Sequence, residues 1–252
     1  MARGERNGAP LPGEERFYRA WAVGAGLSRF DVVVAETDLQ IFAEQPLTDE
    51  TNAAVRRARR DVEFYAATHD GFLVSLKPVT ADPGAPEIVK RMCSAGAQYG
   101  VGPMAAVAGA VADFVGRELL RHSRQVIVEN GGDVFFQTDE PPICGLYVGE
   151  HSPFTGRVRF RPLEMDYGGV CTSSGTVGHS LSFGQADGVV IVARDPILAD
   201  AAATAICNSV HTEADVALAI EREKESGLVD GGLIAIGTTL GAWGSVEIIE
   251  GG

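Results

Sequence analysis

The chain has 252 residues, of which 45% are hydrophobic and 22% are charged, close to the average of soluble globular proteins. This composition excludes intrinsic disorder, collagen and coiled coil as descriptions of the whole chain. The net charge of −13 disfavours nucleic acid and anionic membranes as partners, because an acidic surface repels phosphate groups.

The N-terminal residues Met1 to Arg16 are polar and contain no apolar run. We expect a mobile arm over residues 1–16 rather than a signal peptide, and therefore a cytoplasmic protein. No linker-like tract divides residues 17–252, so we predict a single domain there. The uncharged stretch Met92 to Ala112 is long enough to span a bilayer, but its glycine and alanine content predicts a core segment.

Hydrophobic periodicity predicts the secondary-structure elements in chain order. Strands are expected over residues 17–23, 29–36, 38–44, 125–130, 134–137, 143–148, 158–163, 170–173, 188–193, 233–236 and 245–249. Helices are expected from an N-cap at Thr48 or Asp49 to about His69, and over residues 86–94, 103–122, 196–210 and 213–226. Strands and helices come in runs, which favours an α+β fold with a largely antiparallel sheet and packed helices.

The chain has 31 glycines, about 12% of its residues against a typical value of roughly 7%. Two of these glycines belong to a first candidate site. Between two predicted strands, Gly131 and Gly132 would let backbone amides approach a ligand without a Cβ in the way. Asn130 would orient that ligand, and Asp133 would accept a hydrogen bond from it. The alternative interpretation is a plain Asn-Gly hairpin turn.

A second candidate segment runs from Cys171 to Ser182 and is rich in hydroxyl groups. The hydroxyls, the glycine amides and the single histidine, His179, suit an anionic or carbonyl-bearing ligand. The candidate binding residues are Thr172, Ser173, Ser174 and Gly175. The alternative is a Ser/Thr-rich loop. A serine hydrolase is disfavoured, because the nucleophile-elbow motif lacks its second glycine.

A third candidate is the pair Asp200 and Thr204 on a nearly apolar predicted helix. Four residues apart, they share one face of the helix. A carboxylate and a hydroxyl are hard oxygen donors that suit Mg²⁺. The alternative interpretation is that Asp200 caps its own helix and that Thr204 bonds back to the helix backbone.

Together these segments resemble a known group of proteins. The motifs are Gly100-Val-Gly-Pro-Met-Ala105, Val128-Glu-Asn-Gly-Gly-Asp133, Cys171-Thr-Ser-Ser-Gly175 and Ala199-Asp-Ala-Ala-Ala-Thr204. They resemble the cytoplasmic, functionally uncharacterised sister family of the ApbE flavin transferases. The resemblance covers about residues 17–249 and implies a T-fold-like, ApbE-like architecture.

The resemblance also implies site roles. ApbE enzymes use Mg²⁺ to split FAD and attach FMN to a protein threonine. By analogy, Asn130 to Asp133 and Thr172 to Gly175 would bind FAD or FMN. Asp200 and Thr204 would bind Mg²⁺, with a backbone carbonyl near Gly102 to Ala105 completing the metal shell. Only His179 stands where the enzymes carry a catalytic histidine, and the DPxTG-like stretch that follows it there is absent.

Three functions follow from this reasoning. The first is a Mg²⁺-assisted enzyme acting on FAD or another phosphorylated ligand, with His179 as acid or base. The second is a component of sulfide incorporation into homocysteine, in which Cys171 carries sulfur. The third is a ligand-binding or assembly subunit without chemistry. A small phosphorylated ligand or nucleotide is the expected partner, and an exposed sheet edge leaves a homodimer open.

Overall fold

The structure is a computed structural model that describes residues 26–149, 152–175 and 184–250. The predicted arm over residues 1–16 and the predicted strand over residues 17–23 lie outside the described residues.

The fold is built on an eight-stranded sheet in which all neighbouring strands are antiparallel. The strand order is β1-β2-β3-β4-β7-β8-β9-β10. The bounds are β1 Ser28–Val34, β2 Thr37–Ala43, β3 Val126–Asn130, β4 Asp133–Gln137, β7 Tyr167–Ser173, β8 Gly188–Ala193, β9 Gly231–Ile236 and β10 Thr239–Gly244. The predicted α+β class with a largely antiparallel sheet is confirmed.

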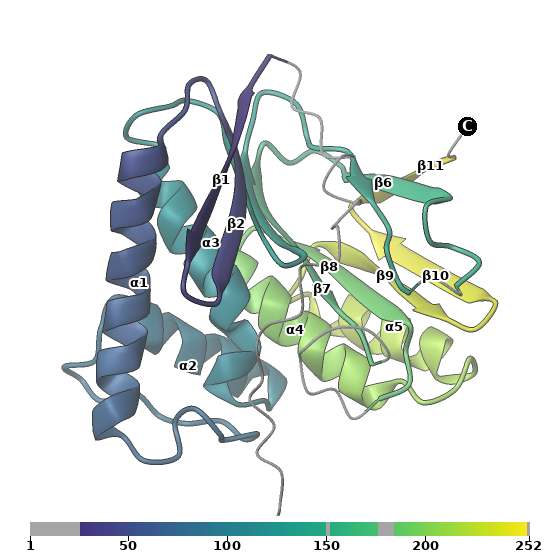
Figure 1. Cartoon of the computed structure of the whole chain (residues 1–252). Coiled ribbons are helices and arrows are strands. Elements are labelled where there is room, and N and C mark those ends of the chain that lie inside the picture. Colours follow the sequence, from purple (N-terminus) through teal and green to yellow (C-terminus); the bar gives the residue numbers. More distant parts are fainter. Residues whose placement is uncertain (1–25, 150–151, 176–183, 251–252) are drawn as a thin grey trace, which may run out of the picture.

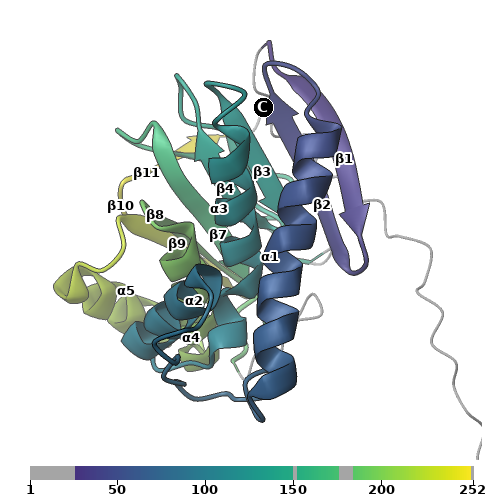
Figure 2. The same cartoon turned by 90° about the vertical axis from the view of Figure 1, so that its left-hand side faces the viewer.

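Helices cover one face of this sheet (Figure 1). Their bounds are α1 Thr48–Thr68, α2 Glu87–Tyr99, the 3₁₀ turn η2 Pro103–Ala106, α3 Val107–Leu119, α4 Pro196–Ser209 and α5 Asp215–Ser226. Figure 2 shows α1, α3 and α4 in front of the strands. Helix α2 packs on α1, α3 and α4 through a buried apolar cluster that includes Met92, Ala110 and Ile197.

A second, three-stranded sheet lies over the opposite face of the large sheet. Its strands, in the order β11-β6-β5, are β5 Cys144–Gly145, β6 Val158–Pro162 and β11 Val246–Glu250. Phe160 of β6 packs with Ile127 and Phe136 of the large sheet. Because both faces of the large sheet are covered, β3 is apolar on both sides: Val126 and Val128 face the helices, and Ile127 faces the small sheet.

Two predicted boundaries are wrong, and one strand is absent from the prediction. The N-cap of α1 is Leu47, which makes no side-chain cap, and not Thr48 or Asp49. The Thr51 hydroxyl instead donates to the Leu47 carbonyl at 2.7 Å. The strand predicted over residues 143–148 shortens to the two residues of β5, and β10 was not predicted at all.

The predicted helix over residues 103–122 is broken. Residues 103–106 form a 3₁₀ turn, and α3 begins only at Val107, because Ala106 leaves the helical region with φ −122° and ψ 10°. Among the described residues no single helix is long and apolar enough to cross a membrane. Helix α2 and residues 103–119 taken together have the length and composition of a membrane span, but the two segments are bent by 105° relative to each other.

Candidate functional site

The β3–β4 turn is a tight hairpin. Asn130 pairs with Asp133 across the ladder, and the two loop residues have positive φ, +67° at Gly131 and +109° at Gly132. Both φ values favour glycine, so the interpretation of this segment as an Asn-Gly hairpin turn is confirmed for the backbone. The Gly132 amide donates to Glu129 Oε1 at 2.9 Å, so that amide points back into the turn.

The two polar residues that flank the turn are held by neighbouring elements. Asn130 Nδ2 donates to the Ala108 carbonyl, in the first turn of α3, at 3.0 Å. Asp133 is buried, and its Oδ1 accepts the backbone N–H of Thr172, in β7, at 3.3 Å. The hairpin is thereby tied both to the start of α3 and to the end of β7.

Asp200, in the second turn of α4, caps a different helix. Its Oδ2 accepts the Gly109 N–H, close to the start of α3, at 2.8 Å. The N-cap of α4 itself is Asp195, whose Oδ1 accepts the Ile197 N–H at 2.9 Å. The alternative interpretation that Asp200 caps its own helix is therefore wrong, because α4 begins a full turn earlier than that interpretation needs.

The helix break at Ala106 frees the backbone groups that contact Asp200 and Thr204. In an unbroken helix the Gly109 N–H would pair with the Ala105 carbonyl, four residues earlier. Here the Gly109 N–H donates to Asp200, and the Ala105 carbonyl faces the Thr204 hydroxyl at 3.5 Å. A Cβ on Gly109 would stand 2.6 Å from the Pro196 carbonyl and 2.8 Å from Asp200 Cβ, so glycine is what lets the two helices approach this closely.

Asp133 and Asp200 form a buried pair of carboxylates. Burial, and then the charge of Asp200, raises the pKa of Asp133 well above its usual range. Burial raises the pKa of Asp200 to about 7, against the opposing effect of the Gly109 and Ala108 N–H groups. Among the described residues, no lysine, arginine or histidine lies within ion-pair distance of either carboxylate. The pair therefore repels itself unless a proton or a cation enters.

Cys171 lies between these groups but is closed to solvent. Its exposed fraction is 0%, and its thiol donates to the Pro196 carbonyl at 3.3 Å. Burial, together with the charges of Asp133 and Asp200, raises the pKa of the thiol well above its usual value. A protonated, buried thiol is a poor nucleophile, which disfavours Cys171 as a sulfur carrier.

The hydroxyl-rich segment is described only up to Gly175. The Ser173 hydroxyl is buried and has no hydrogen-bond partner among the described residues. Ser174 Oγ donates to the Asp187 carbonyl at 2.7 Å, and the Gly175 N–H donates to the Ala186 carbonyl at 2.9 Å. The predicted catalytic residue His179 lies outside the described residues.

The donor set of this site fits a hard divalent cation. Asp200 offers carboxylate oxygens, Thr204 a hydroxyl and Ala105 a backbone carbonyl, which are ligand types that Mg²⁺ accepts. Within the described part of the chain, no group of three or more His, Cys, Asp or Glu side chains is arranged so that it could hold a metal ion by itself. Any metal here would therefore rely on the hydroxyl, the carbonyl and ligand oxygens in addition to the carboxylates.

Two features of the site went unrecognised at the level of sequence. One is the pair of α3 amides, Ala108 and Gly109, that faces Asp200. A glycine inside a predicted helix costs about 1 kcal/mol relative to alanine, so Gly109 was a usable signal. The other is the electrostatic interaction of Asp133 with Asp200, which no local pattern shows.

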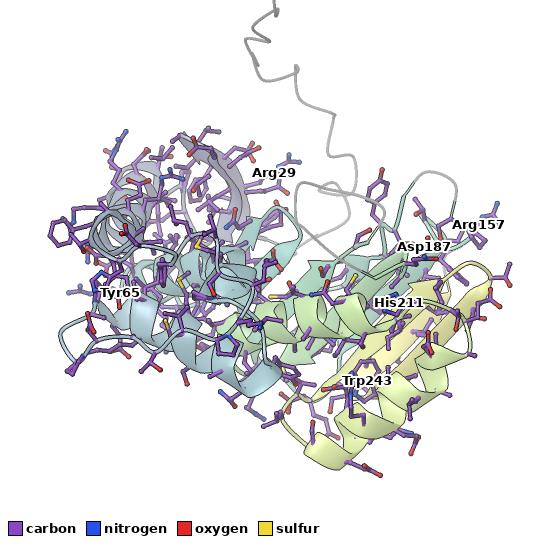
Figure 3. The ribbon with its side chains drawn as sticks, turned by 90° about the horizontal axis from the view of Figure 1, so that it is seen from below. Arg29, Tyr65, Arg157, Asp187, His211 and Trp243 are labelled. Atoms are coloured by element: carbon purple, nitrogen blue, oxygen red, sulfur yellow. The ribbon has the colours of Figure 1, made fainter. Side chains whose placement is uncertain are left out.

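The structure also has a pocket of about 390 Å³ away from these residues. It lies between the end of α1 and the following loop, and its lining includes Tyr65, His69, Phe72 and Asp82. Figure 3 shows Tyr65 on the opposite side of the molecule from Trp243. None of the candidate site residues that the structure describes lines this pocket.

Solved structures with the same architecture are ApbE proteins. The ApbE protein of Thermotoga maritima superposes with a TM-score of 0.56 at 12% identity, covering 87% of this chain and 97% of that one. The flavin transferase ApbE of Vibrio cholerae gives a TM-score of 0.55 at 11% identity, covering 87% and 97%. At such identities the likeness establishes the fold.

Relatives with higher sequence identity show the family to which the chain belongs. A UPF0280 protein of Methanosphaerula palustris is 44% identical over 214 residues, covering 84% of this chain and 88% of that protein. A UPF0280 protein of Methanospirillum hungatei is 42% identical over 217 residues, covering 85% and 86%. Residues 19–235 match the model of a family described as "AbpE bacteria". The chain belongs to this ApbE-like family, which confirms the resemblance seen in its motifs.

Proposed function

We propose that the chain binds a flavin nucleotide, or another phosphorylated ligand, together with a divalent cation, and acts on the phosphate groups. One observation carries the proposal: the buried carboxylates of Asp133 and Asp200 meet without a cationic side chain among the described residues. Further support comes from the fold, because solved structures that share it are described as flavin transferases.

The proposed metal ligands are Asp200 and Thr204, with the Ala105 carbonyl beside them. When bound, Mg²⁺ supplies positive charge that stabilises developing charge on phosphate oxygens. A buried site strengthens this effect, since charges interact more strongly where water is excluded.

The nucleotide itself would be oriented by residues that the fold already holds. Asn130 is fixed by the Ala108 carbonyl, and Asp133 by the Thr172 N–H. In this proposal, residues Thr172 to Gly175 lie beside the same nucleotide, and the buried Ser173 hydroxyl donates to a ligand oxygen. His179 stays a proposed acid or base.

A thermal-shift screen tests the proposal. Wild-type protein is heated with FAD, FMN, ATP, ADP or O-phosphohomoserine, each with and without Mg²⁺. A ligand at one hundred times its Kd stabilises the folded state by about 2.7 kcal/mol. We expect a Mg²⁺-dependent shift with FAD. The matched variant Asp200→Asn keeps an acceptor for the Gly109 N–H but removes the charge, and it should lose that shift.

The same screen separates the alternatives. A shift with FAD that does not depend on Mg²⁺ contradicts the metal role, and no shift with any nucleotide contradicts the proposal. A shift with O-phosphohomoserine alone would move the function to sulfide incorporation. Incubation with FAD and Mg²⁺, followed by chromatography for FMN and AMP, distinguishes an enzyme from a binding subunit.

A further inference from the structure

A cluster of paired charges lies beside the candidate site and joins the same helices. Asp113 lies in α3 one turn beyond Gly109, and Asp195 immediately precedes α4. The guanidinium of Arg91, on α2, reaches both: Nη1 donates to Asp113 Oδ2, and Nη2 donates to Asp195 Oδ1 at 2.9 Å. One side chain from a third helix therefore bridges α3 and α4.

Both carboxylates that Arg91 contacts are fixed parts of their helices. Asp195 Oδ1 also accepts the Ile197 N–H and so caps α4. Asp113 is fully buried and also accepts Arg117 Nε at 2.9 Å. A guanidinium is a planar, rigid fork of donors. Arg91 therefore constrains both the distance and the direction between the start of α4 and the middle of α3.

The Arg91 bridge and the Gly109–Asp200 hydrogen bond are successive contacts between the two helices. Gly109 and Asp113 are four residues apart and share one face of α3. On α4, Asp195 stands just over a turn before Asp200. A slip of α4 along α3 would therefore separate Asp200 from the Gly109 N–H and Thr204 from the Ala105 carbonyl at the same time.

We propose that Arg91 is a positioning residue of the candidate site. It sets the register of α4 on α3, and through that register it holds Asp200 and Thr204 in place. The effect of Arg91 on metal binding rests on the proposed function, whereas the register of α4 on α3 can be measured without any ligand.

Arg117 provides the matched control. It donates to the same buried carboxylate, Asp113, but it lies four residues further along α3 itself. Its guanidinium packs over the Tyr167 ring, 5.4 Å from the centroid, and has no ion pair with Asp195 among the described residues. Arg117 thus shares the charge neutralisation of Asp113 without sharing the bridge to α4.

The experiment compares Arg91→Lys with Arg117→Lys. Lysine keeps the charge but is a point charge that cannot donate along two forked directions. In the ligand-free protein, hydrogen exchange of the Gly109 amide is followed by NMR. With FAD present, the Kd for Mn²⁺ is measured by EPR. Residues that orient metal ligands typically change metal affinity by about 10–100-fold when altered.

We expect Arg91→Lys to speed Gly109 exchange and to weaken Mn²⁺ binding by at least about tenfold, whereas Arg117→Lys leaves both nearly unchanged. Equal effects of the two variants, or an unchanged Gly109 amide in Arg91→Lys, would overturn the inference. If wild-type protein binds no metal, the proposed function fails, and Gly109 exchange alone decides the register. Asp195→Asn keeps a good N-cap and must also speed Gly109 exchange.

Discussion

Two acidic clusters lie about one turn apart along the contact between helices α3 and α4, and they differ in whether a cationic side chain pairs with them. Asp113 and Asp195 are neutralised by Arg91 and Arg117. Asp133 and Asp200 meet no cationic partner among the described residues. The first cluster fastens the helices with charges from within the chain. The second is held by backbone N–H groups, and the proposed function assigns a bound cation to it. The paired cluster therefore has a structural role, whereas the unpaired cluster is the candidate site.

The largest expected effect comes from breaking the paired cluster. Asp113→Asn leaves Arg91 and Arg117 without their shared carboxylate. Removing one partner of a buried ion pair typically costs about 3–5 kcal/mol. The two arginine side chains are 23% and 49% exposed, so water screens part of this loss. We expect urea unfolding to show a loss of roughly 2–4 kcal/mol; a loss near zero would contradict the fastening role.

A smaller effect is expected at the contact between the two helices. Gly109→Ala places a Cβ within 2.6 Å of the Pro196 carbonyl and must push α3 away from α4. Overpacking of this kind typically costs about 1–3 kcal/mol. The control is Gly84→Ala, where a Cβ meets nothing within 4 Å. Thermal unfolding should show a loss for Gly109→Ala alone, together with weaker Mg²⁺-dependent ligand binding.

The unpaired cluster should respond in the opposite direction. Asp200→Asn replaces one carboxyl of the poorly compensated buried pair with a neutral amide while keeping an acceptor for the Gly109 N–H. Without metal, we expect urea unfolding at neutral pH to show unchanged or higher stability, by up to roughly 1–2 kcal/mol, because replacing poorly compensated buried charge is often stabilising. A clear loss of stability in Asp200→Asn would show that the two clusters do not differ in the way described.

An exposed pair, His69 and Asp82, gives the smallest effect. The Tyr65 carbonyl, 2.8 Å from Nδ1, and Asp82, 2.6 Å from Nε2, raise the pKa of His69. Because the folded-state pKa is raised, the contribution of the pair to stability is present at acid pH and is lost as pH rises through that pKa. An NMR titration should give an imidazole pKa above about 6.5, and Asp82→Asn should lower it.

Much of this architecture was predictable from periodicity. The apolar run of β8 and the spacing of α4 gave their positions, and the Asn-Gly signal gave the β3–β4 hairpin. The four-residue spacing of Asp200 and Thr204 placed both on one helix face. Strand β10 was missed because its glycines, Gly241 and Gly244, leave no alternating apolar pattern.

The remaining features depend on contacts between distant segments. Apolar spacing continues through Ala106, so local pattern predicts an unbroken helix. The break is supported by tertiary partners, with Asp200 accepting the Gly109 N–H 91 residues away along the chain. The contacts of Arg91 with Asp113 and Asp195 likewise span 22 and 104 residues. No window of sequence contains such pairs.

In the proposed function, a divalent cation balances the charge of Asp133 and Asp200. Mn²⁺ titration followed by EPR, in the presence of FAD, tests this most directly. The account predicts one Mn²⁺ site per chain in the wild-type protein, competed by Mg²⁺ and lost in Asp200→Asn. Absence of Mn²⁺ binding in the wild-type protein, or equal binding in Asp200→Asn, would contradict it.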